Sequence, residues 1–175
     1  LCIRVGAAFT NYYIVRLPDG KSDATHYENT AWELSRLDFS RLIDLYPGIH
    51  ASFYPWLMSL VYAGTGRSLL LLQSLSVLAG VMGVYFTWYL ARELWGIKVA
   101  IKAAWVMALF PTVVMYSAIP LRETYAVLFF LIGSIGIVRC YGGKKFQGIL
   151  LVMFGFLCAS FFHGGMAIGL FAFLF

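Results

Sequence analysis

Acidic side chains gather in one segment of this chain. Residues 18–50 hold six of its eight Asp and Glu residues, and Asp23 comes just before a stretch with helical spacing. A carboxylate there accepts backbone N–H groups as a helix cap, or takes a proton from an acceptor hydroxyl or amine as a general base. The sequence leaves both roles of Asp23 open. Glu28 and Glu33 are expected to be solvated helix positions.

A second charged motif, Arg122-Glu123, follows Pro120 between two apolar stretches. A carboxylate at the mouth of membrane spans is costly unless it is paired or faces a wet cavity. Either the two side chains pair with each other or reach the headgroups, or Arg122 binds a phosphate through charge-assisted hydrogen bonds. In the second case Glu123 shares one exterior-facing cavity with Asp23.

Three further candidates lie near expected membrane interfaces. His50 and Tyr54 flank the start of an apolar, aromatic segment, and Arg67 precedes a long uncharged stretch. Interfacial His and Tyr are common belt residues, and Arg67 could cap a span at the headgroups, so each has a structural role beside a ligand-binding one.

Several usual motifs of soluble chemistry are missing from the sequence. The three cysteines have neither disulfide nor metal spacing. The sequence contains no Walker loop, HExxH, dinucleotide fingerprint or nucleophile elbow. ATP-driven transport, zinc proteolysis and dinucleotide chemistry therefore lose their usual support.

Composition decides which class of protein must position these residues. The chain has 175 residues, 61% of them hydrophobic and only 12% charged. Soluble domains have about 45–50% apolar and about 25% charged residues. A soluble enzyme and a disordered or nucleic-acid-binding tail are excluded, and an integral membrane protein is predicted. The alternation of β-barrel strands is absent, so the spans are expected to be helices.

Uncharged stretches predict where the spans lie, since about 20 helical residues cross about 30 Å of hydrocarbon. We expect 1–175 to be part of one transmembrane domain, truncated within a span at both ends. Its expected segments are a partial span 1–17, an exterior loop with surface helices 18–66, and spans 67–92, 99–119, 121–140 and 146–175.

Basic residues predict the orientation of these spans. They gather in two loops that fall on one side if the spans alternate, and the positive-inside rule makes that side cytoplasmic. These residues are Arg92, Lys98 and Lys102 in one loop and Arg139, Lys144 and Lys145 in the other. The loop 18–66 and the link before Glu123 then face the extracytoplasmic side.

Local motifs predict how the exterior loop is built. Thr25-His26-Tyr27-Glu28 fits a capping box that begins a surface helix over about 26–38. A turn at Tyr46-Pro47-Gly48 leads to a second surface helix within 50–63. The predicted fold is all-α, a polytopic transmembrane helical bundle with extracytoplasmic juxtamembrane helices. Small-residue spacing at Gly165 and Gly169 suggests close helix packing.

The order of these motifs resembles a known superfamily. An exterior Asp23 follows the first span in Ser22-Asp23-Ala24-Thr25-His26-Tyr27, and the aromatic-Pro segment Tyr54-Pro55-Trp56-Leu57 comes next. Gly64-Thr65-Gly66-Arg67 then opens a span, and Leu121-Arg122-Glu123 closes a later Pro-containing one. In these features residues 10–140 are similar to the N-terminal half of GT-C glycosyltransferases, most of all to the protein O-mannosyltransferase and lipid A aminoarabinose transferase group.

The resemblance implies a bacterial inner-membrane enzyme with an extracytoplasmic active site. It would move a sugar from a polyprenyl-phosphate-linked donor to a glycan, lipid or protein acceptor. Asp23 lies where the family has its general base, and Glu123 where relatives often carry a second acid. Ala24 stands where the protein mannosyltransferases have a Glu, which argues against protein mannosylation.

The remaining site residues follow as expected substrate contacts. The phosphate leaving group needs cationic stabilisation, from Arg or from a divalent cation. Arg122 and Arg67 are expected to contact the carrier phosphate, and Tyr27, His50 and Tyr54 to contact donor or acceptor.

Two alternatives stay open. A polysaccharide polymerase or ligase would use the same kind of donor, with Arg122 more important than Asp23. A transporter would show charged or broken helices near the midplane, for which His163 and its glycines are the one hint. In a non-catalytic assembly subunit Asp23, Arg122 and Glu123 would be replaceable without loss of activity.

Overall fold

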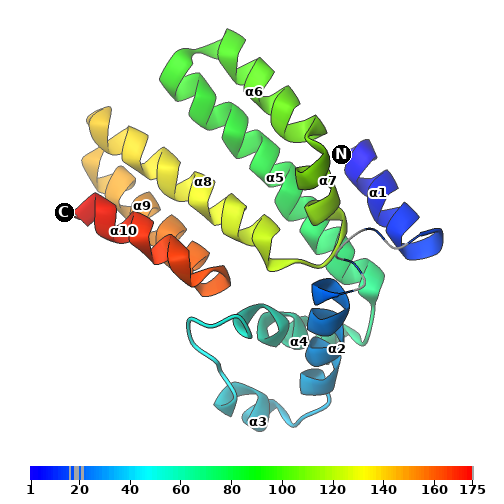
Figure 1. The fold of residues 1–175 in the computed structure, drawn as a ribbon. Coiled ribbons are helices and arrows are strands. Elements are labelled where there is room, and N and C mark those ends of the chain that lie inside the picture. Colours follow the sequence, from blue (N-terminus) through cyan, green and yellow to red (C-terminus); the bar gives the residue numbers. More distant parts are fainter. Residues whose placement is uncertain (16, 18–19, 21, 175) are drawn as a thin grey trace.

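The computed structural model describes residues 1–15, 17, 20 and 22–174, and within them every element is a helix (Figure 1). The prediction of an all-α protein is confirmed. Residues 16, 18, 19, 21 and 175, which belong to the predicted end segments and exterior loop, lie outside the described residues. In chain order the elements are α1 (Cys2–Tyr13), α2 (Asp23–Ser35), α3 (Phe39–Asp44), α4 (Phe53–Thr65), α5 (Leu69–Trp95), α6 (Ile97–Leu109), α7 (Pro111–Ala118), α8 (Arg122–Tyr141), α9 (Lys145–Phe162), a 3-10 turn (Gly164–Met166) and α10 (Ala167–Leu174).

Three helices, α5, α8 and α9, are long and apolar enough to cross a membrane. α6 and α7 make a fourth candidate only as a bent pair, with 57° between their axes. α1 has 12 described residues, about 18 Å of helix, which is less than the hydrocarbon thickness. These helices are consistent with an integral membrane protein.

Pro111 bends the predicted span 99–119. Proline has no N–H, so the Met107 carbonyl loses its helical partner. Nη2 of Arg4 donates to that carbonyl at 2.9 Å, and Nη1 donates to the Ser117 hydroxyl on α7. Arg4 is only 2% exposed, and these oxygens stabilise its buried guanidinium. These hydrogen bonds of Arg4 hold α1 against the bend between α6 and α7.

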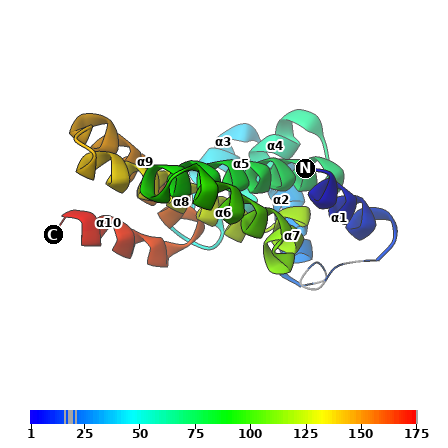
Figure 2. The same ribbon diagram turned by 90° about the horizontal axis from the view of Figure 1, so that it is seen from above.

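The predicted span 146–175 is divided in the structure. α9 ends at Phe162, where the backbone of His163 is extended and two glycines follow. Glycine is a poor helix former, so the helix stops there. α10 then runs back along α9, as Figures 1 and 2 show, and the segment forms a helical hairpin.

Glycines bring α8 and α9 unusually close together. A Cβ atom on Gly155 would lie 2.2 Å from the backbone nitrogen of Gly133, and one on Gly136 would lie 2.7 Å from the Gly148 carbonyl oxygen. Small residues allow this approach, and van der Waals packing between the helices then stabilises it.

α2, α3 and α4 gather at one end of the bundle (Figure 1). α2 packs on α4, and their buried side chains share an apolar core with the first turns of α5 and α8. The members of this core include Ala24, Tyr27, Ala31, Tyr54, Met58, Tyr62, Leu72, Ile119, Leu121 and Ala126. α2 and α4 are therefore fixed to the first turns of α5 and α8.

α2 begins three residues before the predicted position 26, because Ser22 is its N-cap residue. The Thr25 hydroxyl donates to the Gly20 carbonyl at 2.8 Å, and the Glu28 carboxylate accepts hydrogen bonds from Arg67. The predicted capping box is wrong, because both of its side chains bond elsewhere.

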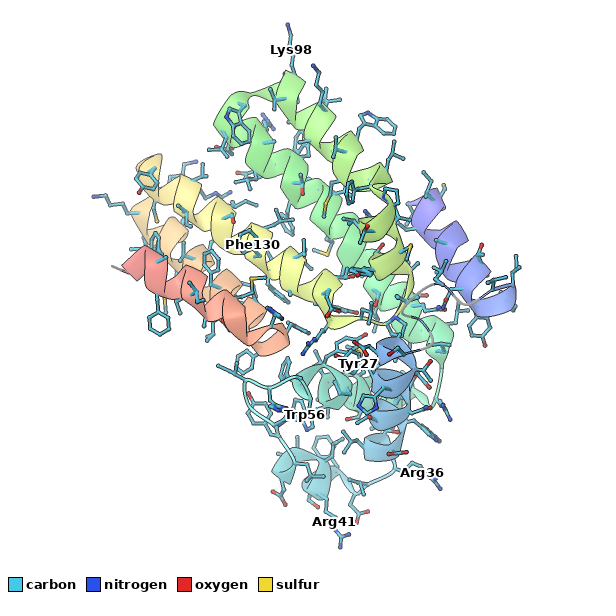
Figure 3. All side chains as sticks on the ribbon, viewed as in Figure 1. Tyr27, Arg36, Arg41, Trp56, Lys98 and Phe130 are labelled. Carbon is cyan, nitrogen blue, oxygen red and sulfur yellow. The ribbon has the colours of Figure 1, made fainter. Side chains whose placement is uncertain are left out.

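The two basic loops lie at the opposite end of the bundle from α2–α4 (Figure 1). Figure 3 labels Lys98 at that end, while Tyr27 lies at the end where α2 meets α8. Which side of a membrane each end faces stays a prediction.

Candidate functional site at the mouth of the bundle

Tyr27 lies at the point where the first turns of α2 and α8 meet (Figure 3). Its ring is 9% exposed, and the Arg122 guanidinium carbon lies 6.0 Å from the ring centroid. The Tyr54 ring packs edge-on against it with centroids 5.5 Å apart. Residues of α2, α4 and α8 therefore converge on this one side chain.

Three charged side chains surround Tyr27. Burial raises the pKa of Tyr27, the Arg122 guanidinium opposes the rise, and the carboxylates of Glu123 and Asp23 add to it. Asp23 is exposed, one helical turn before Tyr27, and its Oδ1 accepts a hydrogen bond from the Ser22 hydroxyl at 3.2 Å. Glu123 and Asp23 are far apart in the sequence, and both raise the pKa of this phenol.

The two oxygens of Glu123 have different surroundings. Oε1 lies 3.4 Å from Nε of Arg122, a long ion pair between adjacent residues. Oε2 is buried and has no hydrogen-bond partner among the described residues. One oxygen of Glu123 therefore lies beside Arg122 at the mouth, and the other is buried inside the bundle.

Further buried polar groups lie beside Glu123. Among the described residues, the hydroxyls of Tyr54, Ser76 and Tyr125 and both amide atoms of Gln73 have no hydrogen-bond partner. The Tyr54 and Tyr125 rings are 5.6 Å apart. Burial raises the pKa of Tyr54 well above its ordinary value, with a further rise from Tyr125 and a smaller one from Glu123, while the Ser76 hydroxyl lowers it.

We call Tyr54, Gln73, Ser76, Glu123 and Tyr125 the inner polar cluster. Ser76 interacts with Tyr54 electrostatically, but the geometry of a hydrogen bond is not reached. An unpartnered buried polar group costs about 1–3 kcal/mol and calls for a bound water, an ion or a functional role. The cluster is thus suited to hydrogen-bond a polar ligand.

Sequence reasoning missed three members of this cluster. Gln73 and Ser76 are three residues apart in an otherwise apolar helix, so they lie on the same face. Polar side chains in an apolar helix long enough to span a membrane are functional candidates by default, and this spacing is the signal that could have identified them. Tyr125 had no comparable signal, because aromatic residues are frequent in this chain.

Arg67 is engaged in a structural pair. Nε and Nη2 donate to the two carboxylate oxygens of Glu28 at 2.9 and 2.7 Å, and Tyr62 donates to Oε1 at 3.1 Å. Glu28 is 7% exposed, so the expectation of a solvated Glu28 is wrong. The carboxylate is buried because this pair joins α2 to the start of α5.

A polar pocket of about 390 Å³ lies beside this pair and is lined by Asn11, Thr25, Asn29 and Arg67. A separate groove of about 400 Å³ lies between α1 and α5 and is lined mostly by apolar side chains, among them Val5, Phe9, Leu70, Val77 and Val81.

His50 stands apart from the other candidates. It is exposed and precedes α4 in the chain. Its Nδ1 lies 3.1 Å from the Ser52 hydroxyl oxygen and accepts a hydrogen bond from the Ser52 backbone N–H at 3.2 Å. Its imidazole contacts this N-cap residue, and its backbone bonds to Gly48 and Phe53. The structure therefore brings Asp23, Tyr27, Tyr54, Arg122 and Glu123 together, and places Arg67 and His50 elsewhere.

The shared cavity of Asp23 and Glu123 stays a prediction. Glu123 lines a small pocket of about 60 Å³ between α5, α7 and α8, and Asp23 does not. No group of three or more His, Cys, Asp or Glu side chains that could hold a metal ion occurs among the described residues.

Comparison of the chain with known protein families, curated proteins and solved structures identifies no relative. No family model, curated protein or solved structure matches the chain. Fold and site together define an all-helical protein with three or four helices able to span a membrane and a charged, aromatic mouth at one end.

Proposed function

We propose that this chain is the N-terminal part of an integral-membrane glycosyltransferase of the GT-C type. It takes a sugar from a polyprenyl-phosphate-linked donor and transfers it to an acceptor at the extracytoplasmic face. The observation that carries the proposal is that Arg122, paired with Glu123, lies over the ring of Tyr27, one helical turn after Asp23.

The chemistry needs a base and a cationic site close together. Asp23 takes the proton of the acceptor hydroxyl, and the acceptor oxygen forms a bond to the anomeric carbon. The bond between that carbon and the phosphate oxygen breaks, and the phosphate leaves on its carrier. Direct displacement inverts the configuration at this carbon.

Arg122 supports the role of leaving-group cation. Its ion pair with Glu123 is long, its side chain is 22% exposed, and it sits in the first turn of α8. The first turns of α2 and α8 both lie here, and helix N-termini favour anions. The phosphate therefore meets a guanidinium and two helix ends.

The inner polar cluster supports a sugar subsite. Hydroxyl and amide groups can donate to and accept from sugar hydroxyls, a carboxylate can accept from them, and these groups of the cluster have no partner among the described residues. The apolar groove between α1 and α5 offers room for the lipid part of a donor or acceptor.

The test begins with the full-length protein extracted gently from its own membranes. Native mass spectrometry is expected to show a bound polyprenyl phosphate or its glycosylated form, and Arg122→Ala is expected to weaken this binding. Only ordinary phospholipids, even after carrier is added, would favour a transporter or assembly subunit instead.

Asp23→Asn tests the catalytic step. Transfer of sugar from the co-purified donor is expected to fall about 100-fold or more, the usual contribution of a general base, with carrier binding unchanged. Asp38→Asn is the matched control, since Asp38 is also an exposed aspartate at a helix start in the same segment. Full transfer by Asp23→Asn together with loss in Arg122→Ala would favour the polymerase or ligase.

A further inference from the structure

A groove opens between the helices at the end of the bundle opposite Tyr27. Its volume is about 290 Å³, and its walls come from α5, α8 and α9. Apolar and aromatic side chains line it, among them Tyr85, Phe86, Ile132, Leu151 and Phe154. Arg139 lines the same groove and is its only charged lining residue.

Arg139 is held in place by an aromatic side chain. Its Nη2 donates to the Tyr89 hydroxyl at 2.7 Å, and its guanidinium carbon lies 5.5 Å from the centroid of the Tyr89 ring. In the described part of the chain, no carboxylate lies within ion-pair distance of it. The guanidinium is therefore oriented, partly buried and without an anion.

The surroundings of Arg139 have a strong charge imbalance. Glu93 is the one acidic residue in the loops and helix ends at this end of the bundle. Against it stand Arg92, Lys98, Lys102, Arg139, Lys144 and Lys145. An anion is thus the ligand that the electrostatics favour, whereas a zwitterion or a neutral headgroup gains little.

We propose that this groove binds an anionic phospholipid of the leaflet at the basic end. The phosphate contacts Arg139, and an acyl chain lies between α5 and the α8–α9 pair, against Phe86, Ile132 and Phe154. Basic pockets between membrane helices recognise anionic headgroups through such an arrangement. This site lies at the far end from Tyr27, and the inference does not rest on the proposed glycosyl transfer.

Native mass spectrometry of the full-length protein tests the site. Phosphatidylglycerol and phosphatidylcholine with the same acyl chains are added separately, and the anionic lipid is expected to bind more tightly. Arg139→Gln should weaken phosphatidylglycerol binding about fivefold, which corresponds to about 1 kcal/mol for one basic contact. Arg139→Lys should retain most of the binding.

Arg92→Gln is the matched control. Arg92 lies 5.3 Å from the Trp88 ring centroid at the same end, but it does not line the groove, so binding should stay within about twofold. Ile132→Trp fills the groove and leaves Arg139 in place, and it should also weaken binding. Equal affinity for the two lipids, equal loss in Arg92→Gln, or unchanged binding in Ile132→Trp would each overturn the proposal.

Discussion

At the scale of single residues, burial and pairing separate charges that look alike in the sequence. Arg67 and Arg36 both stack on Trp32, with guanidinium carbons 5.7 and 6.0 Å from the ring centroid. Only Arg67 also binds Glu28, through two parallel hydrogen bonds. Such a bidentate pair fixes geometry as well as charge, so Arg67 holds α2 to α5.

Arg67→Ala should destabilise the protein more than Arg36→Ala. The first variant leaves the Glu28 carboxylate buried without its cation. This lowers the free energy of unfolding by about 2 kcal/mol, a value smaller than for a fully buried pair because solvent screens the partly exposed Arg67. The apparent melting temperature should fall by roughly 4–8 °C in thermal unfolding monitored by circular dichroism. Arg36→Ala should change it little, and equal shifts in the two variants would contradict a structural role for the ion pair.

At the scale of helices, glycine positions decide how closely neighbours pack. The spacing of Gly165 and Gly169 drew attention in the sequence, and Gly169 does approach α9, where its Cβ would lie 2.6 Å from the Phe156 ring. The closest backbone approach is instead between Gly133 and Gly155. Their role depends on the register of α8 against α9.

Gly155→Ala should therefore destabilise the α8–α9 pair. Its Cβ would meet backbone atoms, which cannot move without separating the helices, at a cost of about 1–3 kcal/mol for overpacking. Gly83→Ala is the control, because its Cβ would lie 3.5 Å from the terminal carbon of Met107, an ordinary contact. Thermal unfolding should show a lower melting temperature for Gly155→Ala alone, and a comparable loss for Gly83→Ala would count against tight α8–α9 packing.

At the scale of the whole molecule, α5 connects two ends of opposite character. α2–α4 and the mouth lie at its start, and the first basic loop follows its end. If α5 crosses a membrane once, the two ends face opposite compartments, and the positive-inside rule assigns the basic end to the cytoplasm.

Cysteine labelling checks this topology in a variant without Cys2, Cys140 and Cys158. Ser40→Cys on exposed α3 should react with a membrane-impermeant maleimide in intact cells, because the positive-inside rule predicts that α2–α4 face outward. Lys98→Cys should react only in inverted membrane vesicles. Labelling of both positions from the same side would rule out α5 as a single crossing.

The sequence by itself determined the class of protein and the limits of α5 and α8. Hydropathy is a local property, because the transfer free energy of each side chain adds along a span regardless of its neighbours. The charged mouth at Arg122-Glu123 was predictable for the same reason, since an interruption of an apolar stretch is visible in one dimension. GT-C-type sugar transfer stays a prediction.

Only the tertiary structure decided which polar groups meet. Arg4 reaches carbonyl and hydroxyl oxygens more than 100 residues away, and Arg67 finds Glu28 at a separation of 39 residues. These contacts depend on which helix faces pack together and in which register. Hydrogen bonds and ion pairs act over a few ångströms, so no local pattern in the sequence can specify them.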